Sequence, residues 1–76
     1  MNAGQKQFLA FMMERAEEEK ATEVQGILHE TFAAQKGAPL SRKEFEVLKD
    51  RLTKLMKPQN VPEVNRAMDH YGRDLD

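Results

Sequence analysis

Phe8-Leu9-Ala10-Phe11-Met12-Met13 is the stretch of this 76-residue chain that decides its fold. The whole stretch is apolar, and no β-branched residue occurs between Met1 and Lys20. Good helix formers fill that region instead. At about 100° per residue, the large side chains of the stretch cover roughly 200° of a helix. Because a helix with one neighbour needs an apolar stripe of only about 100°, we expect this helix to contact at least two neighbours.

Apolar periodicity in the rest of the chain predicts three further helices and therefore an all-α fold. We expect one domain over residues 1–76, built as a small four-helix bundle with helices near 4–19, 22–36, 42–57 and 62–71. The short connections favour antiparallel neighbours. No internal repeat is apparent in the sequence.

The junction between the first two helices permits two interpretations. Glu17–Glu23 contains neither Gly nor Pro, so one continuous helix from Gly4 to Gln35 is compatible with the pattern. Thr22 and Gln25, however, have the spacing of a capping box that begins a new helix. We favour two helices with a break near residues 20–22, because a helix of about thirty residues is long for so small a domain.

The start of the third helix has the clearest local signal. Ser41 and Glu44 have the spacing of a capping box, and Leu40 and Phe45 occupy the positions of a hydrophobic staple around it. Prolines and glycines predict the remaining helix boundaries, because Pro cannot continue a helix and Gly favours its C-terminal cap: Gly37, Pro39, Pro58, Pro62 and Gly72.

The composition argues against catalysis. The chain has no Cys, and its two His residues, His29 and His70, are far apart in sequence. No phosphate-binding loop, nucleophile motif or metal-ligand spacing occurs. We therefore expect a non-catalytic protein with no metal and no cofactor. Since no apolar run approaches the roughly 20 residues of a membrane span and no signal-peptide pattern is present, we expect a cytoplasmic protein that does not enter the membrane.

Small size suggests that the chain needs a partner. A domain of this length buries only about 60% of its unfolded surface, which makes a lone monomer marginal. Without Cys or a metal site, a second copy is the simplest support. We therefore predict a homodimer, with a second protein as a further partner. The predicted self-association interface takes large apolar residues from the first two helices: Phe8, Phe11, Met12, Met13 and Phe32.

Nucleic-acid binding is the alternative function. The net charge of −1 does not indicate it, but the segment 42–57 is locally basic. In that interpretation the phosphate contacts would come from five side chains that are interleaved with acidic residues along one helix: Arg42, Lys43, Lys49, Arg51 and Lys54.

Overall fold

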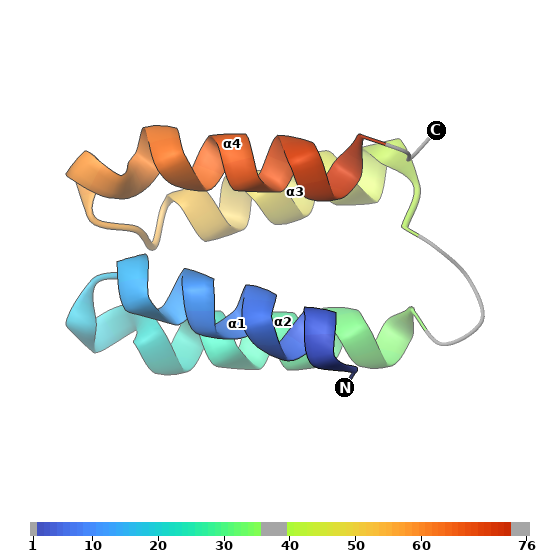
Figure 1. Cartoon of the computed structure of the whole chain (residues 1–76), viewed down its shortest axis with the longest axis horizontal. Helices are drawn as coiled ribbons and strands as arrows, with labels where there is room; N and C mark the ends of the chain where they lie inside the picture. Colours follow the sequence, from blue (N-terminus) through green and yellow to red (C-terminus); the bar gives the residue numbers. More distant parts are fainter. Residues whose placement is uncertain (1, 36–39, 74–76) are drawn as a thin grey trace.

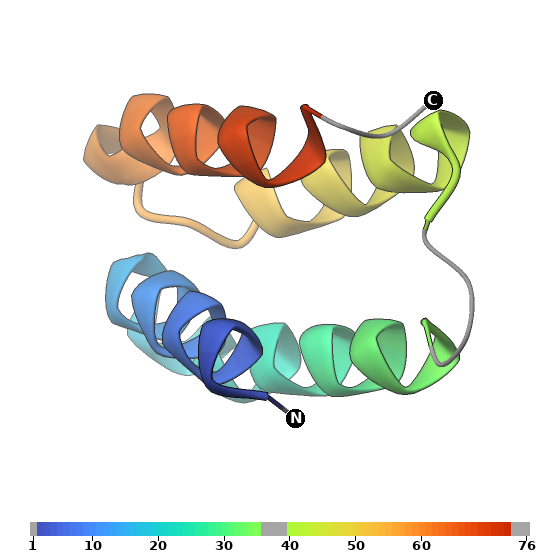
Figure 2. The same cartoon turned by 45° about the vertical axis from the view of Figure 1, so that its right-hand side comes forward.

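The computed structural model describes residues 2–35 and 40–73, which form an all-α fold. Its elements run in the order α1 (Ala3–Arg15), η1 (Glu18–Lys20), α2 (Ala21–Ala34), α3 (Arg42–Thr53), η2 (Pro58–Asn60) and α4 (Val61–Gly72). α1 and α2 form one antiparallel hairpin and α3 and α4 a second, and the turns of both lie at the same end of the molecule (Figure 1). The hairpins remain stacked in the rotated view of Figure 2. The predicted four-helix architecture is confirmed.

The first two helices are separate, and the break lies earlier than predicted. α1 ends at Arg15, and the next residue, Ala16, is extended, with φ −78° and ψ 159°. α2 begins at Ala21 with Lys20 as its N-cap, and no side chain caps it. The capping box predicted at Thr22 is therefore not the start of this helix. The break is fixed by pairing with a distant segment, which the local sequence does not reveal.

That distant segment is the turn of the second hairpin. Ala16 and Met56 form an isolated antiparallel β-bridge. The amide of Glu17 donates to the carbonyl of Leu55 at 3.0 Å, and the amide of Lys57 donates to the carbonyl of Arg15 at 3.2 Å. α3 ends at Thr53 rather than at the predicted residue 57, and the chain passes through a turn at residues 54–55 to reach the bridge at Met56.

The two hairpins are built alike. Each continues from its bridge residue into a one-turn 3-10 helix and then directly into an α-helix. Buried positions also recur along the chain, and four buried residues of the first hairpin have a buried counterpart forty positions later in the second: Met12 and Leu52, Ala16 and Met56, Val24 and Val64, Leu28 and Met68. The repeat is one of burial and backbone shape, since the paired residues are mostly of different types. All eight of these residues belong to one hydrophobic core that both hairpins share.

The structure contains some of the predicted helix caps and does not describe others. The Ser41–Glu44 capping box is present: the amide of Glu44 donates to Ser41 Oγ at 3.1 Å and the amide of Ser41 donates to Glu44 Oε1 at 3.0 Å. Pro62 lies in the first turn of α4, as predicted. The cap and stop predicted at Gly37 and Pro39 fall outside the described residues.

Gly72 closes the core at the end of α4 opposite to the turns. It is buried and forms the last residue of the helix rather than a cap beyond it. A Cβ placed on Gly72 would lie less than 3.0 Å from three ring atoms of Phe45. The start of α3 can therefore approach the end of α4 only because residue 72 has no side chain.

Candidate functional site

The apolar stretch of α1 divides between the core and the surface. Met12 is 0% exposed and lies in the core, as does Phe32 of α2 at 7%. These two members of the predicted interface are enclosed by their own chain, so they are not available to a second one. Phe8, Phe11 and Met13 are only partly buried and pack against the core from outside. The exposed part of the predicted interface is thus reduced to these three side chains.

Two of these side chains, Phe8 and Phe11, line a groove between α1 and α4. It has a volume of about 380 Å³, and its lining residues come from both helices: Gly4, Gln7, Phe8, Phe11, Ala67, His70 and Tyr71. The rings of Phe8 and Tyr71 stack with centroids 4.7 Å apart and an interplanar angle of 25°. Phe8 also meets Phe32 edge to face at 6.4 Å. These ring contacts fix the floor of the groove to the core.

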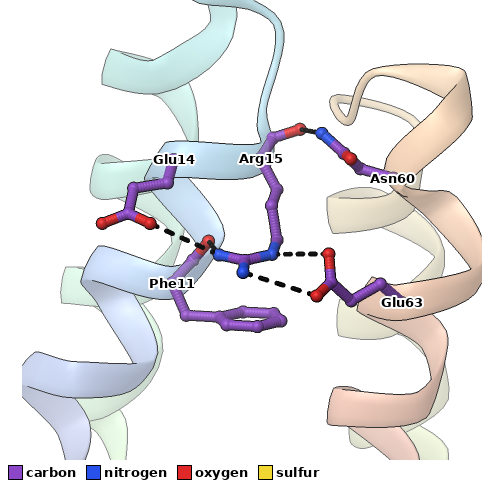
Figure 3. A network of polar contacts seen from close by, with 5 residues as sticks. All are labelled: Phe11, Glu14, Arg15, Asn60 and Glu63. Atoms are coloured by element: carbon purple, nitrogen blue, oxygen red, sulfur yellow. Dashed lines mark hydrogen bonds and ion pairs between the residues drawn. The ribbon is translucent and has the colours of Figure 1, made fainter.

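Arg15 and Glu63 join α1 to α4 near the turn end of the molecule (Figure 3). Arg15 Nε donates to Glu63 Oε1 at 2.8 Å, and a second guanidinium nitrogen donates to Oε2 at 3.4 Å. The guanidinium also lies 3.7 Å from the centroid of the Phe11 ring and donates to the Phe11 carbonyl at 3.1 Å. These contacts hold Phe11 in the wall of the groove, with the charged pair beside it.

The backbone of Arg15 takes part in the same junction. Its carbonyl accepts a bond from the Asn60 side chain at 3.1 Å, in addition to the bond from the Lys57 amide (Figure 3). The hydrogen bonds that Arg15 donates to Glu63 lower the pKa of Glu63 and raise the pKa of Arg15. Both groups are therefore ionised over a wide pH range.

Polar side chains line the outer edges of the groove. Gln7 on α1 and His70 on α4 both line it and are exposed. Further toward the turns, the exposed Glu14 follows Gln7 by two helical turns, and the exposed Arg66 precedes His70 by one. Beyond the lining residues, the α1 side therefore carries Glu14 as well as Arg15, and the α4 side carries Arg66 as well as Glu63.

The five cations of the alternative function are distributed around α3 and its end. Three of them are engaged in ion pairs: Lys49 with Asp69 at 2.6 Å, Lys54 with Asp50 at 2.9 Å, and Arg42 with Glu46 at 3.8 Å. Arg42 also donates to the carbonyl of Gly72. Lys43 and Arg51 are exposed on the same helix. Phosphate contact by these five residues stays a prediction.

Other kinds of site have little support. Within residues 2–35 and 40–73, no group of three or more His, Cys, Asp or Glu side chains is placed to hold a metal ion. His29 and His70 are exposed on α2 and α4. In the same ranges, no helix has both the length and the apolar character needed to cross a bilayer.

No family model, curated protein or solved structure matches this chain. The groove must therefore be interpreted from its own chemistry. Sequence reasoning identified Phe8 and Phe11 but missed the α4 side, namely Ala67, His70 and Tyr71. The sequence signal for that side was the stripe of Val64, Ala67, Met68 and Tyr71, which does not indicate which other helix it will meet.

Proposed function

We propose that this chain is a non-catalytic cytoplasmic protein that acts by self-association, as a homodimer, and by binding a further protein. The observation that carries the proposal is the aromatic groove between α1 and α4. It leaves Phe8 and Phe11 incompletely covered after the rest of the chain has folded. Partly buried aromatic side chains gathered in a concave surface are typical of protein-binding sites.

The wider surface supports the same choice of site. Among the described residues outside the groove, Val47 on α3 is the exposed large apolar side chain, at 54%. It is an isolated residue flanked by Glu46 and Leu48, of which Leu48 is buried. A single exposed valine needs no partner. The groove, by contrast, brings several aromatic residues together.

Sedimentation equilibrium from low to high micromolar concentration tests the proposal. We expect the weight-average mass of the wild type to rise toward twice the 8.8 kDa of one chain. Phe11→Glu should remain monomeric, because it places a carboxylate in the groove wall next to Arg15. Val47→Glu is the matched control, since it adds the same charge on another face and should associate like the wild type. Monomeric wild type at high micromolar concentration would contradict self-association.

A further inference from the structure

We infer that two copies associate about a twofold axis parallel to the helices, so that α1 of each copy rests in the α1/α4 groove of the other. Glu14 of each copy then faces Arg66 of its partner. This inference rests on the proposed self-association and adds its geometry. A twofold axis makes every contact occur twice, so one complementary pair of edges supplies two equivalent interactions.

The outward side of α1 has a shape that suits the groove. Ala3, Gln7, Ala10 and Glu14 follow one another at helical spacing on this side, and all four are exposed. Two of them are alanines, so the helix backbone can approach an aromatic floor closely. The outward side of α4 carries Arg66, His70 and Arg73 instead. Placing α4 in the partner's groove would bring two arginines, Arg66 and Arg73, toward their own copies, whereas placing α1 there brings only one charged residue of this side, Glu14, toward its own copy.

The register of α1 against α4 determines which residues meet. Within one chain the two helices are antiparallel, with Arg15 level with Glu63 and Phe8 level with Tyr71. At 1.5 Å of rise per residue, these two contacts place Glu14 and Arg66 within about 3 Å of each other in position along the helix axis. Gln7 lies equally close to the level of His70.

A twofold axis parallel to the helices preserves these levels. It therefore brings Glu14 of one copy beside Arg66 of the other, and Gln7 beside His70. A twofold axis perpendicular to the helices and in the plane of this face reverses them, so that α1 meets α1, α4 meets α4 and Glu14 no longer faces Arg66. Charge complementarity thus favours the parallel axis. The Glu14 side chain is 74% exposed and one of its carboxylate oxygens lies 3.5 Å from Arg15 Nη1 of the same chain, so the contact with Arg66 of the partner would share or replace that ion pair.

The area of the face formed by α1 and α4 determines how tightly we expect the two copies to associate. The molecule measures 32 × 21 × 19 Å, and α1 and α4 lie in front in the view along its shortest axis (Figure 1). That face offers at most roughly 650 Å² per copy, or about 1,300 Å² in total, near the lower limit for specific interfaces. We therefore expect micromolar rather than nanomolar association.

Charge exchange between Glu14→Arg and Arg66→Glu tests the arrangement. Each variant alone would place like charges at both edge contacts and should weaken its homodimer on the order of tenfold. Mixed in equal amounts, the two variants should form a heterodimer of near wild-type affinity. In that heterodimer the two substituted positions, which carry opposite charges, face each other at one edge, and the unchanged Glu14 and Arg66 face each other at the other edge. Sedimentation of the separate variants and of the mixture measures this, with circular dichroism showing that each is folded.

Two sets of control variants show whether an effect on association is specific to this arrangement. Glu30→Arg and Arg51→Glu reverse exposed charges on α2 and α3 and should associate like the wild type. Ala10→Trp should block entry of α1 into the groove, whereas Ala33→Trp on α2 should not. If the wild type dimerises but the charge-exchanged mixture gains nothing over its components, the arrangement is wrong and self-association stands. If the wild type is monomeric, both proposals fail, and the groove is left to another partner.

Discussion

Gly72 and Phe45 show how closely single residues are fitted in this small core. The ring of Phe45 occupies the space that a side chain on Gly72 would need. Arg42, which starts the same helix, donates to the Gly72 carbonyl at 2.9 Å and has its guanidinium 5.4 Å from the Phe45 ring. The end of α4 and the start of α3 are thus joined by a ring, a backbone carbonyl and a cation.

Gly72→Ala should therefore lower the free energy of unfolding by about 1–3 kcal/mol, the usual cost of an added methyl group in a packed core. Gly26→Ala is the matched control, because a Cβ there has nothing within 4 Å. It should raise the free energy of unfolding by about 0.5–1 kcal/mol through helix propensity. Urea titrations measure both, and equal effects of the two substitutions would contradict the close packing.

The Arg15–Glu63 pair gives the stability of the fold a dependence on pH. The pKa of Glu63 is lowered from its ordinary value of 4.5, first by its hydrogen bonds with Arg15. The folded state therefore binds the proton less readily than the unfolded state. The stabilisation is complete above the unfolded-state pKa and is lost as pH falls through the lower pKa of the folded state.

Glu63→Gln should consequently remove part of the acid sensitivity. We expect the difference in unfolding free energy between wild type and Glu63→Gln to shrink as pH falls from neutral into the acid range. The pKa of Glu44 is also lowered, by its hydrogen bonds with Ser41. Glu44 contributes the same pH dependence to the wild type and to Glu63→Gln, so the difference in unfolding free energy between the two proteins reports on Glu63. A difference that is constant with pH would show that the ion pair does not stabilise the fold.

At the scale of the elements, a helix boundary that is set by neighbouring residues can be predicted from the sequence, whereas one that is set by contact with a distant segment cannot. The capping box at Ser41 was predicted because its partners are three residues apart. α1 begins with an equivalent box, in which Asn2 and Gln5 exchange hydrogen bonds of 3.0 and 2.8 Å. The same local rule could have found it. The end of α1 could not be found in this way, because the bridge to Met56 that extends Ala16 joins residues forty positions apart.

The contrast between Ser41 and Thr22 makes this testable. Ser41→Ala should reduce the free energy of unfolding by about 1 kcal/mol, since it removes the side-chain acceptor at the start of α3. Thr22→Ala should have little effect, because Thr22 is exposed and α2 has no side-chain cap. Thermal and urea denaturation of the two variants provide the comparison. A larger loss for Thr22→Ala would mean that the capping box predicted there does form.

For the molecule as a whole, the sequence predicted the fold class, and its predicted interface included two of the residues that line the groove, Phe8 and Phe11. The 200° apolar arc of α1 was correctly seen to need more than one neighbour. The width of the arc could not show which of its side chains face inward. Phe11 and Met12 are adjacent and differ by about 100° around the helix, which places Met12 in the core and Phe11 in the groove wall. The α4 wall depends on how distant helices meet, which no local pattern specifies.

The shared core also predicts how the two hairpins behave when separated. Buried residues of both hairpins form one core, and a chain of fewer than about 40 residues rarely folds without support. Peptides 1–37 and 38–76 should therefore show little helix alone and recover it when mixed in equal amounts. Circular dichroism of the peptides and the mixture measures this. Full helicity in either peptide alone would contradict a core that both hairpins share.

The bridge between Ala16 and Met56 has a mechanical consequence. It ties the hairpins at the turn end, whereas the start of α1 and the end of α4 both lie toward the opposite end (Figure 1). A force pulling Ala3 away from Gly72 would open the α1/α4 contact from that end, separating Phe8 from Tyr71 before Arg15 from Glu63. Contacts that break in succession resist little load, so this protein should yield to tension by unzipping at low force, with the bridge as the last point to part.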